Sequence, residues 1–216
     1  MIKAVFFTVM LGLGVAHAAP MTSFDTPTGT MTAPVVARST PPPEIVLPAG
    51  RPDALLRDGF QKLTQFLSTE SAVDPKAIRA YLGQEVAQYF DFDVMGRWAA
   101  GPFYQKLNSE QKAQFATKLQ GLFLDGLARN LGSYSRPLPK TQIYPFGKSR
   151  RANLMTVRAR VMPNRAYPVN VDFRFAARDG EWKVYDVSAN GFSAVAFYRQ
   201  HFASRARSKG ISAFYE

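Results

Sequence analysis

The sequence predicts an α+β fold in which helices pack on one face of a curved antiparallel sheet of about four strands. Apolar residues recur at helical spacing through the first half of the folded domain, and they alternate with polar residues through most of the second half. Helices followed by a meander of strands are typical of α+β folds. Both patterns are rich in large side chains, with 17 Phe, 9 Tyr and 7 Met in the chain. Two concave layers of such side chains predict that the helices and the sheet enclose an apolar pocket.

Two segments precede the folded domain, which we expect to span residues 51–216. Residues 1–18 combine Lys3, an apolar run and the small-x-small sequence Ala16-His17-Ala18, and together these features predict a cleaved secretory signal peptide. Residues 19–50 contain seven of the 15 prolines and six threonines, so we expect a disordered or polyproline-like tether there. Export places the mature chain outside the cytoplasm, most simply in a bacterial periplasm.

Four helices are expected before the sheet. The first begins at Pro52, and the second begins at Pro75, after a capping residue at Asp74. Asp91 caps the third helix, which Gly101-Pro102 interrupts. The fourth helix is the longest, begins at Asn108 or Ser109 and ends near Gly132. Its apolar stripe consists of Phe115, Leu119, Leu122, Phe123, Leu127, Leu131 and Tyr134.

The strands follow in the order of a meander. Alternation predicts strands over residues 154–161, 167–175 and 181–187, and a further strand around residues 143–146. The sequence Ala177-Arg178-Asp179-Gly180 is typical of a hairpin turn between two of them. A last helix is expected from about Ser193 to Ser208, ending at Gly210.

Composition excludes several kinds of site. The chain has no cysteine, so it can form no disulfide, thiolate nucleophile or cysteine-ligated metal centre. Its two histidines, His17 and His201, are too few for a histidine-rich metal site. The sequence also has no phosphate-binding glycine loop and no dinucleotide-binding fingerprint. We therefore expect neither a metal nor a cofactor.

A few polar residues leave an enzyme as an alternative. Asp186, Ser193 and His201 are the three residue types of an acyl-transfer triad, but the sequence around Ser193 lacks the second glycine of a nucleophile elbow. The simpler interpretation is that Ser193 caps the last helix and that Asp186 ends a strand. A carboxylate could also act as general acid or base in a cone-shaped α+β pocket. The candidates for that role are Asp91, Asp93, Asp172 and Asp186.

The formal net charge of +11 lies almost wholly on the folded domain. Surfaces that bind nucleic acid interleave aromatic residues with cations, whereas the aromatic residues here lie on the opposite, inward faces, so we expect no nucleic-acid partner. The remaining anionic partners are lipid head groups and acidic proteins. The cations gather near the second strand at Lys148, Arg150, Arg151, Arg158 and Arg160, and on the last helix at Arg199, Arg205, Arg207 and Lys209.

Two segments are similar to those of a known family. The first contains Phe90-Asp91-Phe92, Val94-Met95, Phe103-Tyr104 and Ser109-Glu110-Gln111-Lys112. The second contains Trp182-Lys183-Val184-Tyr185-Asp186-Val187, Gly191-Phe192-Ser193, Tyr198-Arg199 and Lys209-Gly210. In this order, behind a signal peptide, they resemble the MlaC (toluene-tolerance) family of periplasmic phospholipid-binding proteins over about residues 52–215. The matching residues, which we interpret mainly as fold-defining, are Phe90, Asp91, Trp182, Tyr185, Asp186, Gly191 and Ser193.

The resemblance implies a carrier and not an enzyme. Proteins of this family bind a glycerophospholipid non-covalently and shuttle it between an outer-membrane lipoprotein/porin complex and an inner-membrane ABC transporter complex, which preserves the lipid asymmetry of the outer membrane. We expect the protein to act as a monomer, with phospholipid as cargo and with transient contacts to membrane surfaces. Asn190 stands where the family commonly has an acid, and the tether is long. A divergent branch whose cargo is another envelope lipid, such as a hopanoid, therefore stays an alternative.

The resemblance also implies that the acyl chains lie between the helices and the sheet. Tyr185 can join either face of the sheet, because Trp182 and Val184 alternate to the other side. The residues that we expect to line the pocket are Phe115, Leu119, Leu122 and Phe123 on the longest helix, and Met155, Val157, Val169, Val171, Phe173 and Tyr185 on the sheet.

Overall fold

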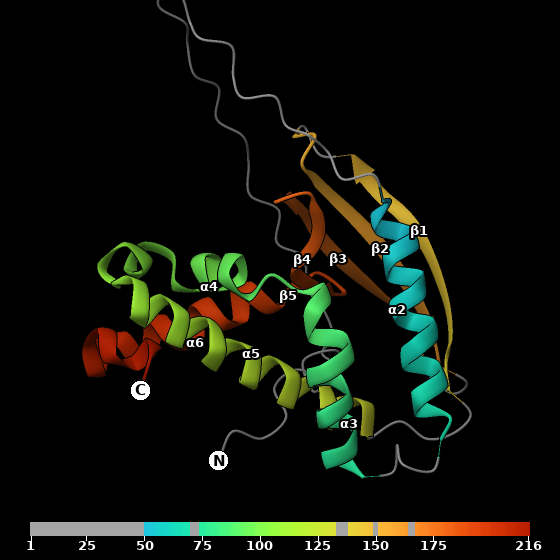
Figure 1. Cartoon of the computed structure of the whole chain (residues 1–216), viewed down its shortest axis with the longest axis horizontal. Helices are drawn as coiled ribbons and strands as arrows, with labels where there is room; N and C mark the ends of the chain where they lie inside the picture. The colour runs from blue at the N-terminus through green and yellow to red at the C-terminus, as the bar shows by residue number, and fades with distance from the viewer. Residues whose placement is uncertain (1–49, 70–73, 133–137, 149–150, 164–166) are drawn as a thin grey trace, which may run out of the picture. The chain divides into compact units, whose positions relative to one another are not determined.

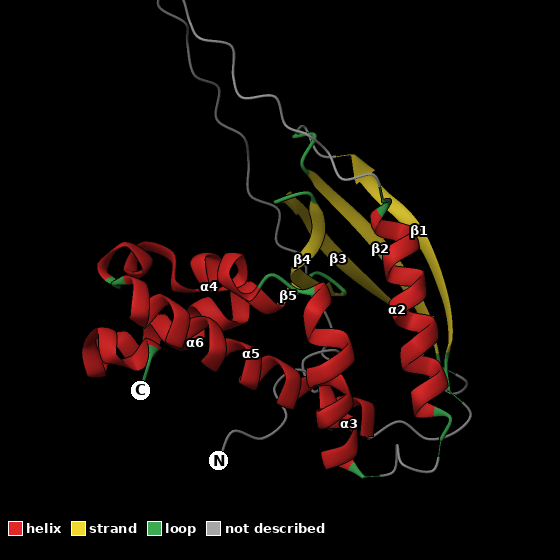
Figure 2. Cartoon of the chain, in the orientation of Figure 1, coloured by secondary structure: helices red, strands yellow, loops and turns green. Residues whose placement is uncertain are grey.

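The structure is a computed structural model that describes residues 50–69, 74–132, 138–148, 151–163 and 167–216. Helical elements come first, an antiparallel sheet follows, and one long helix comes after the sheet (Figure 1). Figure 2 shows α2 lying along the sheet, with α3, α4, α5 and α6 grouped beside it. The predicted α+β fold is confirmed. The predicted signal peptide, nearly all of the predicted tether, Tyr134 and Arg150 lie outside the described residues.

The first helices begin where the sequence predicts. α2 (Pro52–Leu67) has Pro52 in its first turn. α3 (Pro75–Tyr81) is capped by Asp74, whose carboxylate accepts a hydrogen bond from the amide of Lys76 at 2.9 Å. The helical path then continues through a π segment (Leu82–Val86) and a 3₁₀ segment (Ala87–Tyr89).

The later helices are also set by their caps. α4 (Phe92–Ala100) is capped by Asp91 and is followed at Gly101-Pro102 by a 3₁₀ segment (Gly101–Lys106). Asn108 and Gln111 form a reciprocal capping box at the start of α5 (Ser109–Gly132), with side chain-to-amide distances of 2.8 and 3.0 Å. Asn108 is therefore the cap of the longest helix. α6 (Ala194–Lys209) follows the sheet and ends at Gly210, where a 3₁₀ segment (Gly210–Phe214) begins.

The sheet is an antiparallel meander with the strand order β1-β2-β3-β4-β5. Its strands are β1 (Lys140–Lys148), β2 (Leu154–Met162), β3 (Val169–Arg178), β4 (Glu181–Ala189) and β5 (Phe192–Ser193). The four longer strands match the prediction, and β5 adds two residues at one edge. Two-residue turns join β3 to β4 and β4 to β5. Asp179-Gly180 and Asn190-Gly191 have positive φ there, which Asp and Asn tolerate and Gly favours.

A bulge in β4 changes which side chains face the helices. Phe175 pairs with Val184 and Arg174 pairs with Asp186, so Tyr185 is an extra residue on β4. Val184 and Asp186 are two residues apart, yet the extra residue places them on opposite faces of the sheet. As a result, Val184 faces α2, while Asp186 faces the start of α6.

The apolar interior is divided into two clusters. The helical cluster lies among α3, α4, α5 and α6, and the sheet cluster lies between α2 and the strands. Among the described residues, Phe90 and Val187 pack against both clusters. A domain of this size usually has one contiguous core. The boundary between the clusters, which we call the seam, is therefore an unusual feature of this fold.

Because Phe90 packs against both clusters, its substitution should weaken their attachment. We expect F90A to lower the free energy of unfolding by about 2–3 kcal/mol, somewhat less than for a fully buried phenylalanine. F192A is the matched control, because the Phe192 side chain is 58% exposed and should contribute little. Urea denaturation measures both variants. Equal stability of F90A and F192A would contradict the role of Phe90.

Candidate functional site

The seam is the candidate site, and α2 spans it. Leu56, near the start of α2, belongs to the sheet cluster, whereas Leu63 and Phe66, near its end, pack against the helical cluster. The ring of Phe60 meets that of Phe173 edge-on at 5.8 Å. The ring of Phe66 stacks on that of Tyr81 at 4.0 Å. One helix therefore covers both the sheet and the helical layer with apolar side chains.

The sheet side of the seam consists of inward residues of β2 and β3. The strand register pairs Val157 with Phe173, and both pack in the sheet cluster beneath α2. Val157 is fully buried, but Phe173 stays partly exposed. Three other predicted pocket residues share this face and are also partly exposed, namely Met155, Val169 and Val171. A concave apolar face that its own helices do not fully cover is a surface that an apolar ligand can bury.

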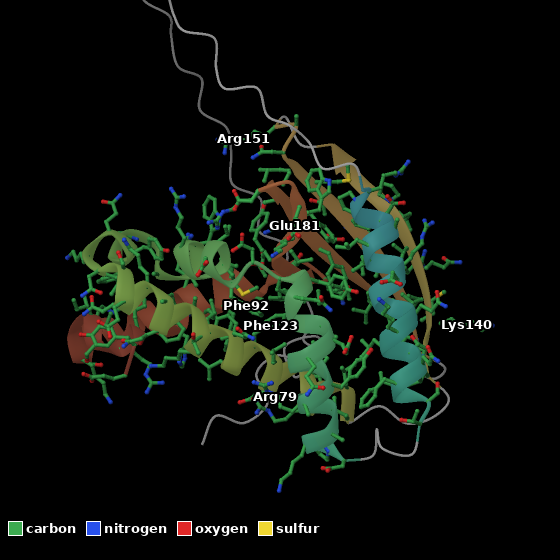
Figure 3. All side chains as sticks on the ribbon, in the orientation of Figure 1. Arg79, Phe92, Phe123, Lys140, Arg151 and Glu181 are labelled. Atoms are coloured by element: carbon green, nitrogen blue, oxygen red, sulfur yellow. The ribbon has the colours of Figure 1, made fainter. Side chains whose placement is uncertain are left out.

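The predicted helix residues do not all reach the seam. Phe115 and Leu119 are fully buried in the helical cluster, and the ring of Phe115 meets those of α6 and the last 3₁₀ segment. Leu122 is 37% exposed, so it lies outside the buried face of α5. Phe123 lies at the junction, where its ring meets that of Phe90 at 5.0 Å and that of Phe92 at 5.9 Å (Figure 3). Of these four residues, the structure brings Phe123 to the seam.

Tyr185 lies on the polar side of the sheet. It is the extra residue of the β4 bulge, next to Asp186. Burial raises the pKa of its phenol, and the nearby charges of Arg174 and Asp186 also act on that pKa. Arg174 and Asp186 pair across β3 and β4 on the face opposite Phe173 and Val187. The structure therefore places Tyr185 with them and away from the other five predicted sheet residues.

Two open grooves lie where the β3–β4 hairpin meets α4 and α5. Their volumes are about 470 and 640 Å³, and both are lined by Asp93, Ala113 and Arg178. The guanidinium of Arg178 contacts the carboxylates of Asp91 at 3.4 Å and Asp179 at 3.2 Å. Asp93 and Glu181 add further carboxylates to the walls. The walls of both grooves therefore carry charges of both signs.

Asp186 and Ser193 lie together, but they form a helix cap and not a catalytic triad. Asp186 is 1% exposed and accepts hydrogen bonds from Arg174 Nη1 at 2.6 Å, Ser193 Oγ at 2.7 Å and the Val195 amide at 3.1 Å. Ser193 Oγ in turn accepts the amide of Ala196 at 3.1 Å. His201 lies eight residues along α6, about 12 Å away at 1.5 Å per residue. It is therefore too far to take the Ser193 proton.

Within the described residues, no three or more acidic or histidine side chains are placed to hold a metal ion. None of the helices in this part of the chain combines the length and the apolar character that a membrane span requires.

Residues 58–216 match the family model of the MlaC protein, and this match covers well over half of the chain. The chain belongs to the MlaC family. The intermembrane phospholipid transport system binding protein MlaC of Haemophilus influenzae is 25% identical over 150 residues, which are 67% of this chain and 69% of the relative. A phospholipid-binding protein from Ralstonia solanacearum, solved in complex with a phospholipid, has the same fold. It is 20% identical, with a TM-score of 0.65, over 74% of this chain and 90% of that protein.

In this member of the MlaC family, the first motif connects α4 to the sheet. The amide of Asp91 donates to the carbonyl of Val184 at 2.9 Å, and Phe90 forms a parallel bridge with Val184. The Asp91 carboxylate accepts the amide of Val94 at 2.9 Å, which caps α4. The same residue thus ends a strand-like contact and begins a helix.

The second motif shapes β4 and the start of α6. Trp182 is buried in the sheet cluster, and Gly191 has a φ of +89° in the turn before β5. Asp186 and Ser193 cap α6, as described above. Asp186, which the sequence predicted to end a strand, lies inside β4, which continues to Ala189.

Sequence reasoning missed the part that α2 plays in the seam. Phe60, Leu63 and Phe66 follow helical spacing, which identifies a buried face but not what covers it. Their partners Phe173 and Tyr81 lie on other elements, and no spacing in the sequence connects them to α2. The aromatic residues of α2 are a weak signal that could have directed attention to this helix.

Loss of the Asp186 carboxylate should destabilise the fold. D186A leaves the Ser193 hydroxyl and the Val195 amide without their acceptor, so we expect a loss of about 3 kcal/mol in the free energy of unfolding. E181A is the control, because Glu181 forms an exposed ion pair with Lys183 and should cost less than about 1 kcal/mol. Urea denaturation distinguishes the two, and an unchanged stability of D186A would exclude this capping role.

Proposed function

We propose that the protein is a periplasmic carrier that binds one phospholipid non-covalently, with the acyl chains in the seam. The observation that carries this proposal is the divided apolar interior. Partly exposed apolar residues of β2 and β3 face α2, and the two clusters share few residues. Membership of the MlaC family supports phospholipid as the cargo, as does the phospholipid in the complex of the Ralstonia solanacearum protein.

Displacement of α2 is the proposed way in which the seam admits a lipid. Among the described residues, few polar contacts hold this helix to its neighbours. Arg57 donates to the carbonyl of Ile143 at 3.1 Å, and Asp58 accepts from the hydroxyl of Tyr89 at 3.2 Å. Lys62 of α2 also interacts with the hydroxyl of Tyr89. The rings of Phe60 and Phe66 contact Phe173 and Tyr81, and acyl chains can replace such apolar contacts without leaving buried polar groups unpaired.

The proposed carrier must also release its cargo. Each buried CH₂ group contributes about 0.8 kcal/mol, so two acyl chains bind too tightly to leave by dilution alone. We propose that docking to the complexes of the two membranes changes the relative stability of the closed and open positions of α2. A ligand or partner shifts such an equilibrium only by its differential affinity for the two states. The proposed partners are an outer-membrane lipoprotein/porin complex and an inner-membrane ABC transporter complex.

Bound lipid should be detectable directly. We expect native mass spectrometry of the protein, purified from an envelope fraction, to show one bound lipid, and organic extraction to identify a phospholipid. An extracted hopanoid would assign the cargo to another envelope lipid. A folded protein that carries no lipid under these conditions would contradict the carrier function.

A charge on the inner face of β3 should expel the cargo. We expect V171D to reduce phospholipid affinity about tenfold or more, because acyl chains would have to cover a carboxylate. T156D is the matched control, since Thr156 pairs with Arg174 on the opposite face and gains the same charge. Lipid phosphorus per protein and circular dichroism are measured for both variants. If T156D lost as much lipid as V171D while both stayed folded, the seam would not be the site.

A further inference from the structure

A cluster of positive charge lies where α5 meets α6, away from the seam. Lys118 of α5 and His201, Arg205 and Lys209 of α6 form this group, which we call the basic cluster. The Nη1 atom of Arg205 is 3.3 Å from Nε2 of His201. The ammonium of Lys118 lies 5.8 Å from the centre of the Phe202 ring, and it donates to the carbonyl of Ala213 at 3.2 Å.

The charges of the basic cluster are close enough to repel one another. Burial lowers the pKa of Lys118, and the charges of Arg205 and Lys209 lower it further, while Glu216 raises it. Burial also lowers the pKa of His201, and Arg205 and Lys118 add to the effect. Within the described residues, no carboxylate forms an ion pair with any member of the cluster. α6 itself contains no acidic residue.

Two arginines of β2 and β3 differ in this respect. Arg158 forms a two-bond ion pair with Asp172, and Arg174 pairs with the buried Asp186. In these two pairs, a carboxylate of the same domain neutralises the arginine. A half-buried lysine beside an arginine and a second lysine is unfavourable for the isolated domain, and an incoming carboxylate would offset that cost.

We propose that the basic cluster is a docking site for an acidic segment of a protein partner. This inference rests on the proposed carrier function only in that a carrier needs docking partners. His201, Arg205 and Lys209 follow one another at intervals of four residues along one edge of α6, and Lys118 faces them from α5. Carboxylates spaced along an extended or helical segment match such a row, and steer its approach through long-range attraction.

The arrangement favours an acidic protein segment over a membrane surface. Arg207 lies about 200° around α6 from Arg205, so the cations of the helix do not form one plane. The exposed large apolar residues of the described chain are Trp98, Leu122, Tyr144, Tyr167 and Phe192. None of these lies on α6 or on the 3₁₀ segment after it, so the helix that carries His201, Arg205 and Lys209 presents no large exposed apolar side chain to insert among lipids. Leu122 lies on α5, four residues after Lys118.

A fluorescently labelled hexaglutamate peptide tests the proposal with the full chain. We expect binding that weakens as salt rises, since salt screens such contacts. R205Q/K209Q should weaken it about tenfold, since two charge contacts are lost. R207Q/K140Q removes the same charge from exposed positions outside the cluster and should bind almost as the unaltered protein does. NMR should show the peptide raising the pKa of His201, because a carboxylate favours the charged imidazole.

Several outcomes would overturn the proposal. One is the absence of peptide binding, and another is an equal loss of affinity in both double variants, which would indicate diffuse attraction. Stronger binding to phosphatidylglycerol vesicles than to the peptide, with the same dependence on Arg205 and Lys209, would assign the cluster to membranes. Extraction of lipid from the same samples separates this test from the carrier function. Loss of lipid together with peptide binding in R205Q/K209Q would show that the cluster acts through the fold.

Discussion

The whole structure depends on one short connection between its helical part and its sheet. Phe90 and Asp91 bridge to Val184, and the amide-to-carbonyl bond between Asp91 and Val184 is 2.9 Å long. Around it, the rings of Phe90, Phe92 and Phe123 pack together. Because α4 begins directly at Asp91, the position of the helical layer is fixed by the same residue that pairs with β4. The helical cluster and the sheet cluster, which lie on either side of this connection, can therefore remain separate from each other.

The separation of the two clusters has a functional consequence. A single tightly packed core leaves no room for a ligand, because interiors pack at the density of organic crystals. In the proposed carrier, two clusters that share Phe90 and Val187 allow one wall to move while the other keeps its structure. α2 is the proposed movable wall, because it packs against both clusters and has few polar bonds among the described residues. The cap formed by Asp186 and Ser193 keeps α6 attached to β4, whatever the position of α2.

The cations of the sheet and those of α6 differ in their partners. On the polar face of the sheet, Arg158 pairs with Asp172 and Arg174 pairs with Asp186 across strands. On α6, the cations have no such partners among the described residues. The seam between the two clusters is lined by apolar residues. A protein without cysteine must hold this arrangement by packing and hydrogen bonds alone.

The fold was accessible from sequence wherever local chemistry decides the structure. Caps at Asp74, Asp91 and Ser193 and the turn at Asp179-Gly180 placed the elements, because these residues act on backbone groups within a few positions. Alternation placed five inward residues of β2 and β3 on one face, since side chains alternate along a strand. Alternation also indicates that Tyr185 lies opposite Val184, whereas the one-residue bulge moves Asp186 to the face of Tyr185, and only pairing with β3 reveals the bulge.

Contacts between distant elements were decided by the tertiary structure alone. The stripe of α5 identifies apolar residues, but it does not say that Phe115 and Leu119 face α6 while Phe123 faces the seam. Three other features depend on which surfaces pack together. They are the position of α2 across the seam, the division into two clusters, and the contact of Lys118 with α6. The sequence by itself determined the elements and their order, because these follow from local backbone preferences. The proposed site requires packing between residues more than a hundred positions apart, such as Phe60 and Phe173, which no local pattern encodes.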